Sequence, residues 1–152
     1  MELREEGEQA HAPHQGGTGV VGLGSELAEA HAPVATRHGE NGWVEQDPLE
    51  LIRSLQCAAR DACDSPAAAG RSVIAAGLAT QRSTIVCWER STGRALTDAI
   101  SWQDRRNAAW LSRLAPVAAQ VRAITGLPLS PHYGASKLRW CLDHVPAVQR
   151  AA

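Results

Sequence analysis

The sequence contains no phenylalanine and a single tyrosine among its 152 residues. Its other aromatic residues are five tryptophans, so the hydrophobic core must be built mainly from Leu, Ile, Val and Ala. A chain of this length can bury about two-thirds of the surface that its unfolded form exposes, which is enough for one core. Because many of the apolar side chains are alanines, we expect that core to be shallow.

The sequence also lacks an excess of positive charge and a long apolar stretch. Its formal net charge is −1, whereas nucleic-acid-binding domains usually carry a clear basic excess, so we expect no nucleic-acid partner. Lys137 is the only lysine. No stretch approaches the about 18 apolar residues of a membrane span, and the first residues, MELREE, are acidic where a secretory signal is basic. We therefore expect a cytoplasmic protein with no membrane partner.

Metal-binding motifs are absent or poor. The sequence has four cysteines, which are Cys57, Cys63, Cys87 and Cys141. They show neither C-x-x-C spacing nor a nearby histidine partner. They are predicted to be reduced, mostly buried thiols, as is typical of a cytosolic protein. His11 and His14 have the spacing H-x-x-H, but a flexible acidic tail does not preorganise a metal site. We expect no bound metal.

Three short apolar runs predict three strands. They cover residues 73–78, 84–88 and 95–100, and Gly93 supplies the turn between the last two. The first run stops just before Arg82, and the third stops just before Trp102. Buried strands that end in polar or aromatic groups are typical edges of an α/β ligand site. The sequence therefore predicts an α/β fold with Arg82 and Trp102 beside each other.

Helices are predicted around these strands. Asp47 can cap a helix that begins at Pro48 and continues to about Cys63, with Glu50 as its third residue. Its inward face is predicted to be Ile52, Leu55, Ala59 and Ala62. Further helices are expected over residues 104–114, 116–125 with Gly126 as the cap, and 135–144. Their inward residues are predicted to be Trp110, Leu111 and Leu114, and then Leu138, Cys141, Leu142 and Val145.

Three segments carry a resemblance to a known family. Residues 77–106, GLATQRSTIVCWERSTGRALTDAISWQDRR, closely resemble the corresponding part of the FGGY carbohydrate kinases, the glycerol kinases above all. Residues 42–48 match the family's GWVEQDP element, and residues 126–140, GLPLSPHYGASKLRW, are similar to its GLPLDPYFSATKLKW element. The resemblance covers about residues 28–150. It implies an incomplete FGGY kinase N-terminal domain over residues 28–152, with a partial ribonuclease H-like, actin-type ATPase fold.

The resemblance also implies a polyol-binding wall. Arg82 corresponds to the arginine of the family's NQRET motif, whose guanidinium fork donates hydrogen bonds to polyol hydroxyls. Trp102 matches the tryptophan whose ring covers the polyol carbons. The alternatives are a surface ion pair for Arg82 and a core aromatic for Trp102. Asp104 and Arg105 are expected to brace the following helix, and the packing tryptophans are predicted to be Trp43, Trp88, Trp110 and Trp140.

Two departures from the family pattern affect the substrate. Ser83 stands where glycerol kinases have a glutamate, so a charge-assisted contact to a hydroxyl becomes a weaker neutral one. His132, followed by Tyr133, stands where they have a tyrosine, and either side chain could reach a hydroxyl. Glycerol is therefore one candidate, and a related polyol or sugar fits equally well.

Residues 1–27 fit the family poorly, and we expect a poorly structured or rearranged lead. Gly16, Gly17 and Thr18 resemble the first phosphate loop, but His14 occupies the position of its aspartate. The stretch from residue 18 to residue 28 looks too short for the usual β-hairpin. With the first strand missing or irregular, an open sheet edge would favour self-association.

Family members transfer the γ-phosphate of ATP, with Mg²⁺, to a sugar or polyol hydroxyl. Their catalytic aspartate and most of their nucleotide contacts lie beyond the point that matches Ala152. We therefore expect an N-terminal fragment that is inactive alone and binds neither ATP nor Mg²⁺ well. The alternative is a non-catalytic remnant or polyol-binding module.

Overall fold

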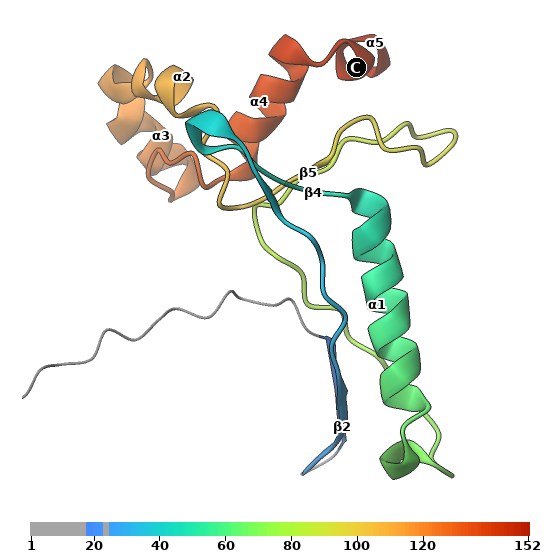
Figure 1. Ribbon diagram of the computed structural model, residues 1–152. Helices are drawn as coiled ribbons and strands as arrows, with labels where there is room; N and C mark the ends of the chain where they lie inside the picture. The colour runs from blue at the N-terminus through green and yellow to red at the C-terminus, as the bar shows by residue number, and fades with distance from the viewer. Residues whose placement is uncertain (1–17, 23–24) are drawn as a thin grey trace, which may run out of the picture.

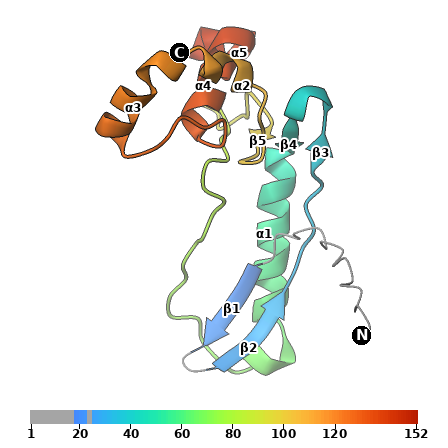
Figure 2. The same cartoon turned by 90° about the vertical axis from the view of Figure 1, so that its left-hand side faces the viewer.

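The computed structural model describes residues 18–22 and 25–152, and it describes side chains from Ala28 onward. The proposed phosphate-loop residues Gly16 and Gly17 lie outside this part, and nothing is described of the side chain of Thr18. Helices gather at one end of the molecule around a small sheet, and a long helix runs toward the other end beside a hairpin (Figures 1 and 2). The predicted α/β fold class is confirmed.

The hairpin consists of β1 (Thr18–Gly22) and β2 (Ser25–Ala30), which pair antiparallel. The prediction that this stretch is too short for a hairpin is therefore wrong. The register shifts between Val20 and Val21. The strand that was expected to be missing or irregular precedes the proposed phosphate loop and lies outside the described residues. Helix α1 (Pro48–Cys63) lies against both strands of the hairpin (Figure 2).

The central sheet is smaller than predicted. It contains β3 (Arg37–His38), β4 (Val44–Gln46) and β5 (Ala99–Ile100), all antiparallel in the order β3-β4-β5. A short 3₁₀ turn, η1 (Glu40–Gly42), joins β3 to β4. The run 84–88 contributes only two isolated bridges, one from Ile85 to Ile100 and one from Trp88 to Ala95. The run 95–100 shortens to β5.

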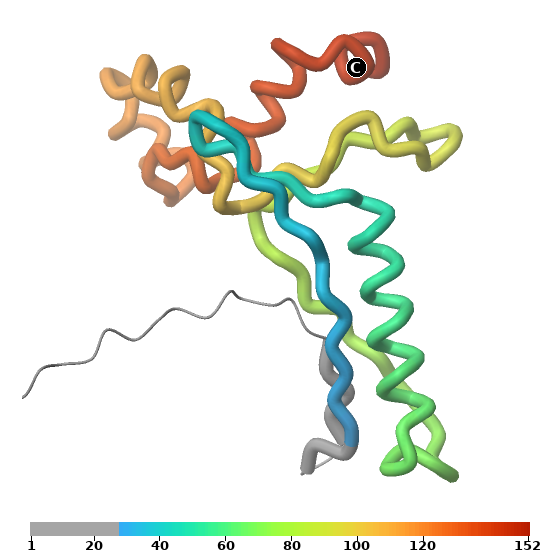
Figure 3. Tube along the Cα trace, viewed as in Figure 1, coloured from blue at the N-terminus to red at the C-terminus, as the bar shows by residue number. Residues whose placement is uncertain are grey.

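The predicted strand over residues 73–78 is wrong. Residues 71–80 form no strand, and the side chain of Ile74 is 93% exposed. An apolar run forms a strand only where a neighbouring strand receives its backbone groups. In the described part of the chain β4 already has partners on both edges, and β5 pairs with β4 and bridges to Ile85. The run therefore continues as an extended segment between α1 and the sheet (Figure 3).

Helix α1 has the predicted bounds because its N-terminus is fixed locally. The Asp47 carboxylate accepts a 2.8 Å hydrogen bond from the backbone N–H of Leu49, and Pro48 opens the first turn. Its predicted inward face is only partly correct. Ala62 is buried, but Ile52 and Leu55 are exposed, since no strand forms at residues 73–78 to cover them.

The remaining helices surround the sheet at the other end of the molecule. After η2 (Pro66–Ala68), they are α2 (Ala108–Ser112), η3 (Ala115–Val117), α3 (Ala118–Thr125), α4 (Gly134–His144) and α5 (Pro146–Ala151). Gly126 caps α3 in the left-handed conformation, with φ 74°, as predicted. Helix α2 starts later than predicted because the carboxylate of Asp104 turns the backbone before it. Leu138 was predicted to face inward but is exposed.

A small apolar core joins α4 and α5 to the sheet. Ile100, Cys141 and Val148 form its buried centre. All four cysteines are free thiols, but Cys57 and Cys63 are exposed, so the prediction of mostly buried thiols is wrong. Both lie on α1, whose neighbouring surface is uncovered. Within residues 18–22 and 25–152, no helix is long and apolar enough to cross a bilayer.

The tryptophans divide between packing and exposure. Trp43 and Trp140 pack edge to face, with ring centroids 5.1 Å apart, as predicted. Trp110 and Leu114 are half-buried, and Leu111 is buried, as their predicted inward positions require. Trp88 is 60% exposed, so its assignment to packing is wrong. It lies in the irregular segment 84–88, where its backbone bridges to Ala95.

Candidate functional site

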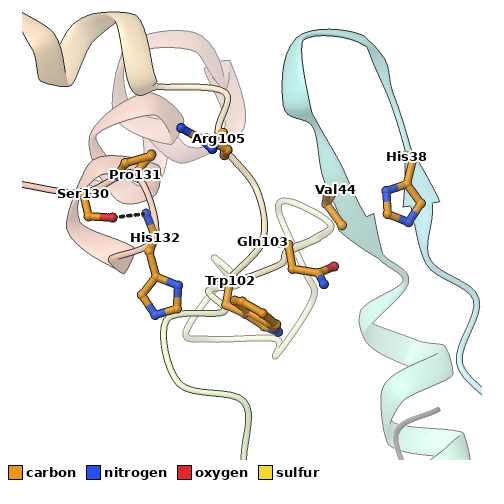
Figure 4. Close-up of a pocket in the computed structure, with 8 residues that line it drawn as sticks. All are labelled: His38, Val44, Trp102, Gln103, Arg105, Ser130, Pro131 and His132. Atoms are coloured by element: carbon orange, nitrogen blue, oxygen red, sulfur yellow. Dashed lines mark hydrogen bonds between the residues drawn. The ribbon is translucent and has the colours of Figure 1, made fainter. Parts of the chain in front are cut away.

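An open cavity of about 550 Å³ lies where three segments meet (Figure 4). The segments are the β3–β4 hairpin, the loop after β5 and the loop before α4. The lining residues are His38, Val44, Trp102, Gln103, Arg105, Ser130, Pro131 and His132. Two of the predicted site residues, Trp102 and His132, are therefore in its wall.

The aromatic side chains form a connected edge of this cavity. The rings of Trp102 and His132 meet edge to face with centroids 5.5 Å apart, and His132 meets Tyr133 in the same way at 5.3 Å. Trp102 is 40% exposed, which is inconsistent with the alternative of a core aromatic. An indole at such a rim offers an apolar face and a donor at its edge.

Arg82 and Ser83 lie next to this wall without lining the cavity. Arg82 is exposed. Ser83 has a φ of 67°, a left-handed conformation that is uncommon outside glycine and costs about 1–3 kcal/mol. Its carbonyl oxygen lies 3.0 Å from Nζ of Lys137. The same amine contacts the backbone carbonyls of Trp102 and His132. Lys137 therefore links the segment of Arg82 and Ser83 to the two aromatic residues of the cavity wall.

Lys137 is a residue that the sequence analysis missed. It is 1% exposed, on the first turn of α4, and its pKa is lowered to about 8 by burial. The negative charge of Asp104 opposes this lowering of the pKa, and the positive charge of Arg106 adds to it. One feature of the sequence could have pointed to Lys137: it is the only lysine of the chain, and it falls within the family-like element GASKLRW.

A second buried network holds the loop after β5. The guanidinium of Arg106 donates to both carboxylate oxygens of Asp104, at 2.8 and 2.9 Å, and to Glu45 at 2.7 Å. It also lies between the rings of Trp43 and Trp140, 3.9 and 4.5 Å from their centroids. Burial alone would lower the pKa of Arg106, but its hydrogen bonds to Asp104 and Glu45 raise it above the ordinary value.

The network ties this loop to two other elements. The backbone N–H of Val44 donates to Asp104 at 2.7 Å, and the side-chain amide of Asn107 donates to the carbonyl of Ser136 at 2.7 Å. Asp104 was predicted to brace the following helix, but its carboxylate instead accepts from Val44 and Arg106, neither of which lies in α2. Arg105 was also predicted to brace the helix, but its side chain is exposed and lines the cavity. Gln103 was missed, although it adjoins Trp102 in the same motif.

The described residues offer no metal site. Within residues 18–22 and 25–152, no group of three His, Cys, Asp or Glu side chains is placed to hold a metal ion. The cavity wall instead presents an indole, an imidazole, an amide and a guanidinium. Such a wall can cover a short carbon chain and hydrogen-bond to its hydroxyl groups.

The fold is that of an actin-type ATPase domain. The crystal structure of Plasmodium falciparum glycerol kinase with ADP matches it with a TM-score of 0.76, over 83% of this chain and 26% of that chain, at 22% identity. A ligand-bound xylulose kinase from Lactobacillus acidophilus matches with a TM-score of 0.75, over 85% of this chain and 26% of that chain, at 20% identity. These similarities establish the fold class.

The family follows from the sequence comparisons. Residues 22–152 match the N-terminal domain of the FGGY family of carbohydrate kinases. Glycerol kinase of Aromatoleum aromaticum is 44% identical over 125 residues, which are 81% of this chain and 25% of that protein. The chain belongs to the FGGY family of carbohydrate kinases, as predicted. It spans about a quarter of the length of the curated relatives it matches.

Proposed function

We propose that this chain forms the substrate-binding wall of an ATP-dependent kinase that phosphorylates a hydroxyl of glycerol or a related polyol. The observation that carries the proposal is the meeting of Trp102 and His132 at one open cavity. Family membership supports carbohydrate phosphorylation, and similarity to proteins named glycerol kinase supports a polyol substrate.

In this proposal the indole of Trp102 covers the carbon chain of the polyol, since an aromatic face buries C–H surface. His132 and Gln103 supply polar groups toward the hydroxyls from the same wall. Arg82, exposed beside the wall, donates a further hydrogen bond from its guanidinium. Tyr133, next to His132, is a second candidate for a hydroxyl contact.

The choice of polyol is proposed to depend on Ser83. A serine hydroxyl makes a weaker neutral hydrogen bond than the glutamate that glycerol kinases place there. Glycerol is therefore one candidate substrate beside longer polyols and sugars.

ATP and Mg²⁺ are proposed as co-substrates of the whole enzyme. Phosphoryl transfer requires a cradle for phosphate and metal, and the residues that resemble the first phosphate loop, Gly16 and Gly17, lie outside the described part of the chain. We expect neither ATP nor Mg²⁺ to bind well to this chain alone, because His14 stands at the position of the aspartate of that loop.

Saturation-transfer NMR tests the binding proposal directly. The unmodified chain, mixed with glycerol, xylitol and ribitol, should transfer magnetisation to at least one of them. Trp102→Ala should abolish the transfer. Trp88→Ala is the matched control, because this tryptophan is also exposed but does not line the cavity. Equal transfer in both variants, or none from the unmodified chain, would contradict the proposal.

A non-catalytic polyol-binding module is the second candidate. It is favoured by one observation: the cavity presents hydroxyl-binding groups, whereas His14 stands at the position of the aspartate of the first phosphate loop. The two candidates predict the same polyol binding. They differ in whether a protein containing this chain turns over ATP.

A further inference from the structure

Three backbone segments of the cavity region converge on one buried amine. The Nζ atom of Lys137 donates to the carbonyl oxygens of Ser83 at 3.0 Å, Trp102 at 3.4 Å and His132 at 2.5 Å. These carbonyls come from three segments: the stretch before Thr84, the loop after β5 and the loop before α4. Each segment carries a residue of the proposed polyol wall.

The number of donors matches the number of acceptors. A protonated lysine has three N–H donors and no acceptor, and here each donor has a carbonyl partner. A buried charge is tolerated only when it is hydrogen-bonded or paired. The charged groups around the amine are Asp104 and Arg106, from the loop after β5. His132 approaches it through its backbone carbonyl.

The amine also holds backbone that would otherwise relax. Ser83 is one of two non-glycine residues with positive φ in the described part of the chain. Such a conformation persists only where its surroundings impose it. The hydrogen bond from Lys137 to the Ser83 carbonyl supplies that restraint. It thereby also fixes the position of the backbone at the neighbouring Arg82.

We infer that Lys137 is the positioning residue of the polyol site, holding the backbone of Ser83, Trp102 and His132 in one arrangement. The inference rests on the proposed function. Lys137 does not line the cavity, so it acts on a ligand through these three segments. Loss of its proton leaves two donors for three carbonyls and turns a lone pair toward one of them, which loosens the wall.

The single lysine makes this inference directly measurable. Lysine labelled with ¹³C at the ε-carbon gives one side-chain resonance, because Lys137 is the only lysine. Burial lowers its pKa to about 8, so the resonance titrates near this pH. A polyol that binds better to the protonated form must raise the titration midpoint, by about one pH unit if the affinities differ about tenfold.

Two measurements on the unmodified chain therefore test the inference. Glycerol, or the polyol found by saturation transfer, should raise the Lys137 midpoint, and its affinity should fall about fivefold between pH 7 and pH 9, if the two protonation states differ about tenfold in affinity. A polyol that binds without moving the midpoint overturns the inference but leaves the proposed function intact. If no polyol binds at any pH, the proposed function itself fails.

A variant provides an independent measurement. Lys137→Met keeps the chain length of the side chain without its charge, and it should bind the polyol about tenfold more weakly at pH 7, with no further loss at pH 9. Arg139→Met is the matched control on the same helix, because Arg139 is exposed and pairs with Asp143. If Lys137→Met binds the polyol with the same affinity and the same pH dependence as the unmodified chain, the inference is overturned.

Discussion

At the residue scale, the two buried cations near the cavity are held by different partners. Arg106 is held by the carboxylates of Asp104 and Glu45 and by two tryptophan rings. Lys137 is held by neutral carbonyls, and burial lowers its pKa to about 8. Arg106 therefore keeps its charge throughout the working pH range, whereas Lys137 loses its charge under mildly alkaline conditions.

The pH dependence of stability follows from Lys137. Between its folded pKa of about 8 and its ordinary value of 10.5, the unfolded chain holds a proton that the folded chain has released. The free energy of unfolding should therefore rise with pH in this range. Burial raises the pKa of Cys141 from 9.0 to about 12, and this opposes the rise above about pH 9.

Urea unfolding at intervals from pH 8 to pH 9 measures this effect. The unmodified chain should gain stability across the interval, and Lys137→Met should not. The same slope in both proteins would show that another group titrates. Stability and polyol affinity are thus expected to change in opposite directions with pH.

Arg82 gives a second prediction at this scale. In a chimera with this chain in place of the matching quarter of Aromatoleum aromaticum glycerol kinase, Arg82→Ala should raise KM and lower kcat together. A hydroxyl contact that orients the nucleophile acts in both the ground and transition states. Loss of a charged donor costs about 1.5–3 kcal/mol in kcat/KM. Steady-state kinetics with glycerol would refute the assignment if both constants stayed unchanged.

At the element scale, helices were predicted more accurately than strands. The bounds of α1 and the cap at Gly126 follow from residues within one turn of each end. The strand expected at residues 73–78 needs a partner far away in sequence, and the sequence pattern does not show whether one is available. The residues of the candidate site show the same contrast between local signals and contacts that are distant in sequence. Motifs predicted Trp102 and His132, which line the cavity, whereas Lys137 contacts Ser83 across 54 positions of sequence.

The capping of α1 gives a prediction for this element. Asp47→Ala removes the acceptor for the Leu49 N–H and should lower the free energy of unfolding by about 0.5–2 kcal/mol. Ile52→Ala, in the same helix, should cost much less, because Ile52 is 52% exposed. Chemical denaturation of both variants checks this order. A larger loss for Ile52→Ala would mean that another surface covers the helix in solution.

At the scale of the whole molecule, several large apolar side chains are uncovered. Those on α1, the extended segment and the irregular strand region include Leu49, Ile52, Val73, Ile74, Leu78 and Trp88. Leu49, Ile52 and Trp88 line one open cavity, and exposed apolar surface of this kind is typical of interaction sites or of aggregation. We expect copies of the isolated chain to associate through these side chains, in addition to the open sheet edge that was expected from the sequence.

Catalysis also belongs to this scale. We predict that the isolated chain releases no ADP from ATP above background with any common polyol, because phosphoryl transfer needs a complete cradle for phosphate and metal and this chain matches only about a quarter of the glycerol kinases it resembles. A coupled ADP-release assay across a polyol panel measures this. Turnover that survives repurification would show that the chain is a complete catalyst.

The extended segment over residues 71–80 has a further consequence. In the described part of the chain, residues 72–82 make no backbone-to-backbone hydrogen bond, and this stretch begins just after Arg71 and ends at Arg82. A protease binds its substrate as an extended strand, so exposed, unpaired backbone is where nicking concentrates. Brief trypsin digestion should therefore cut first at these two arginines, and mass spectrometry would show the helical end of the molecule surviving as one piece.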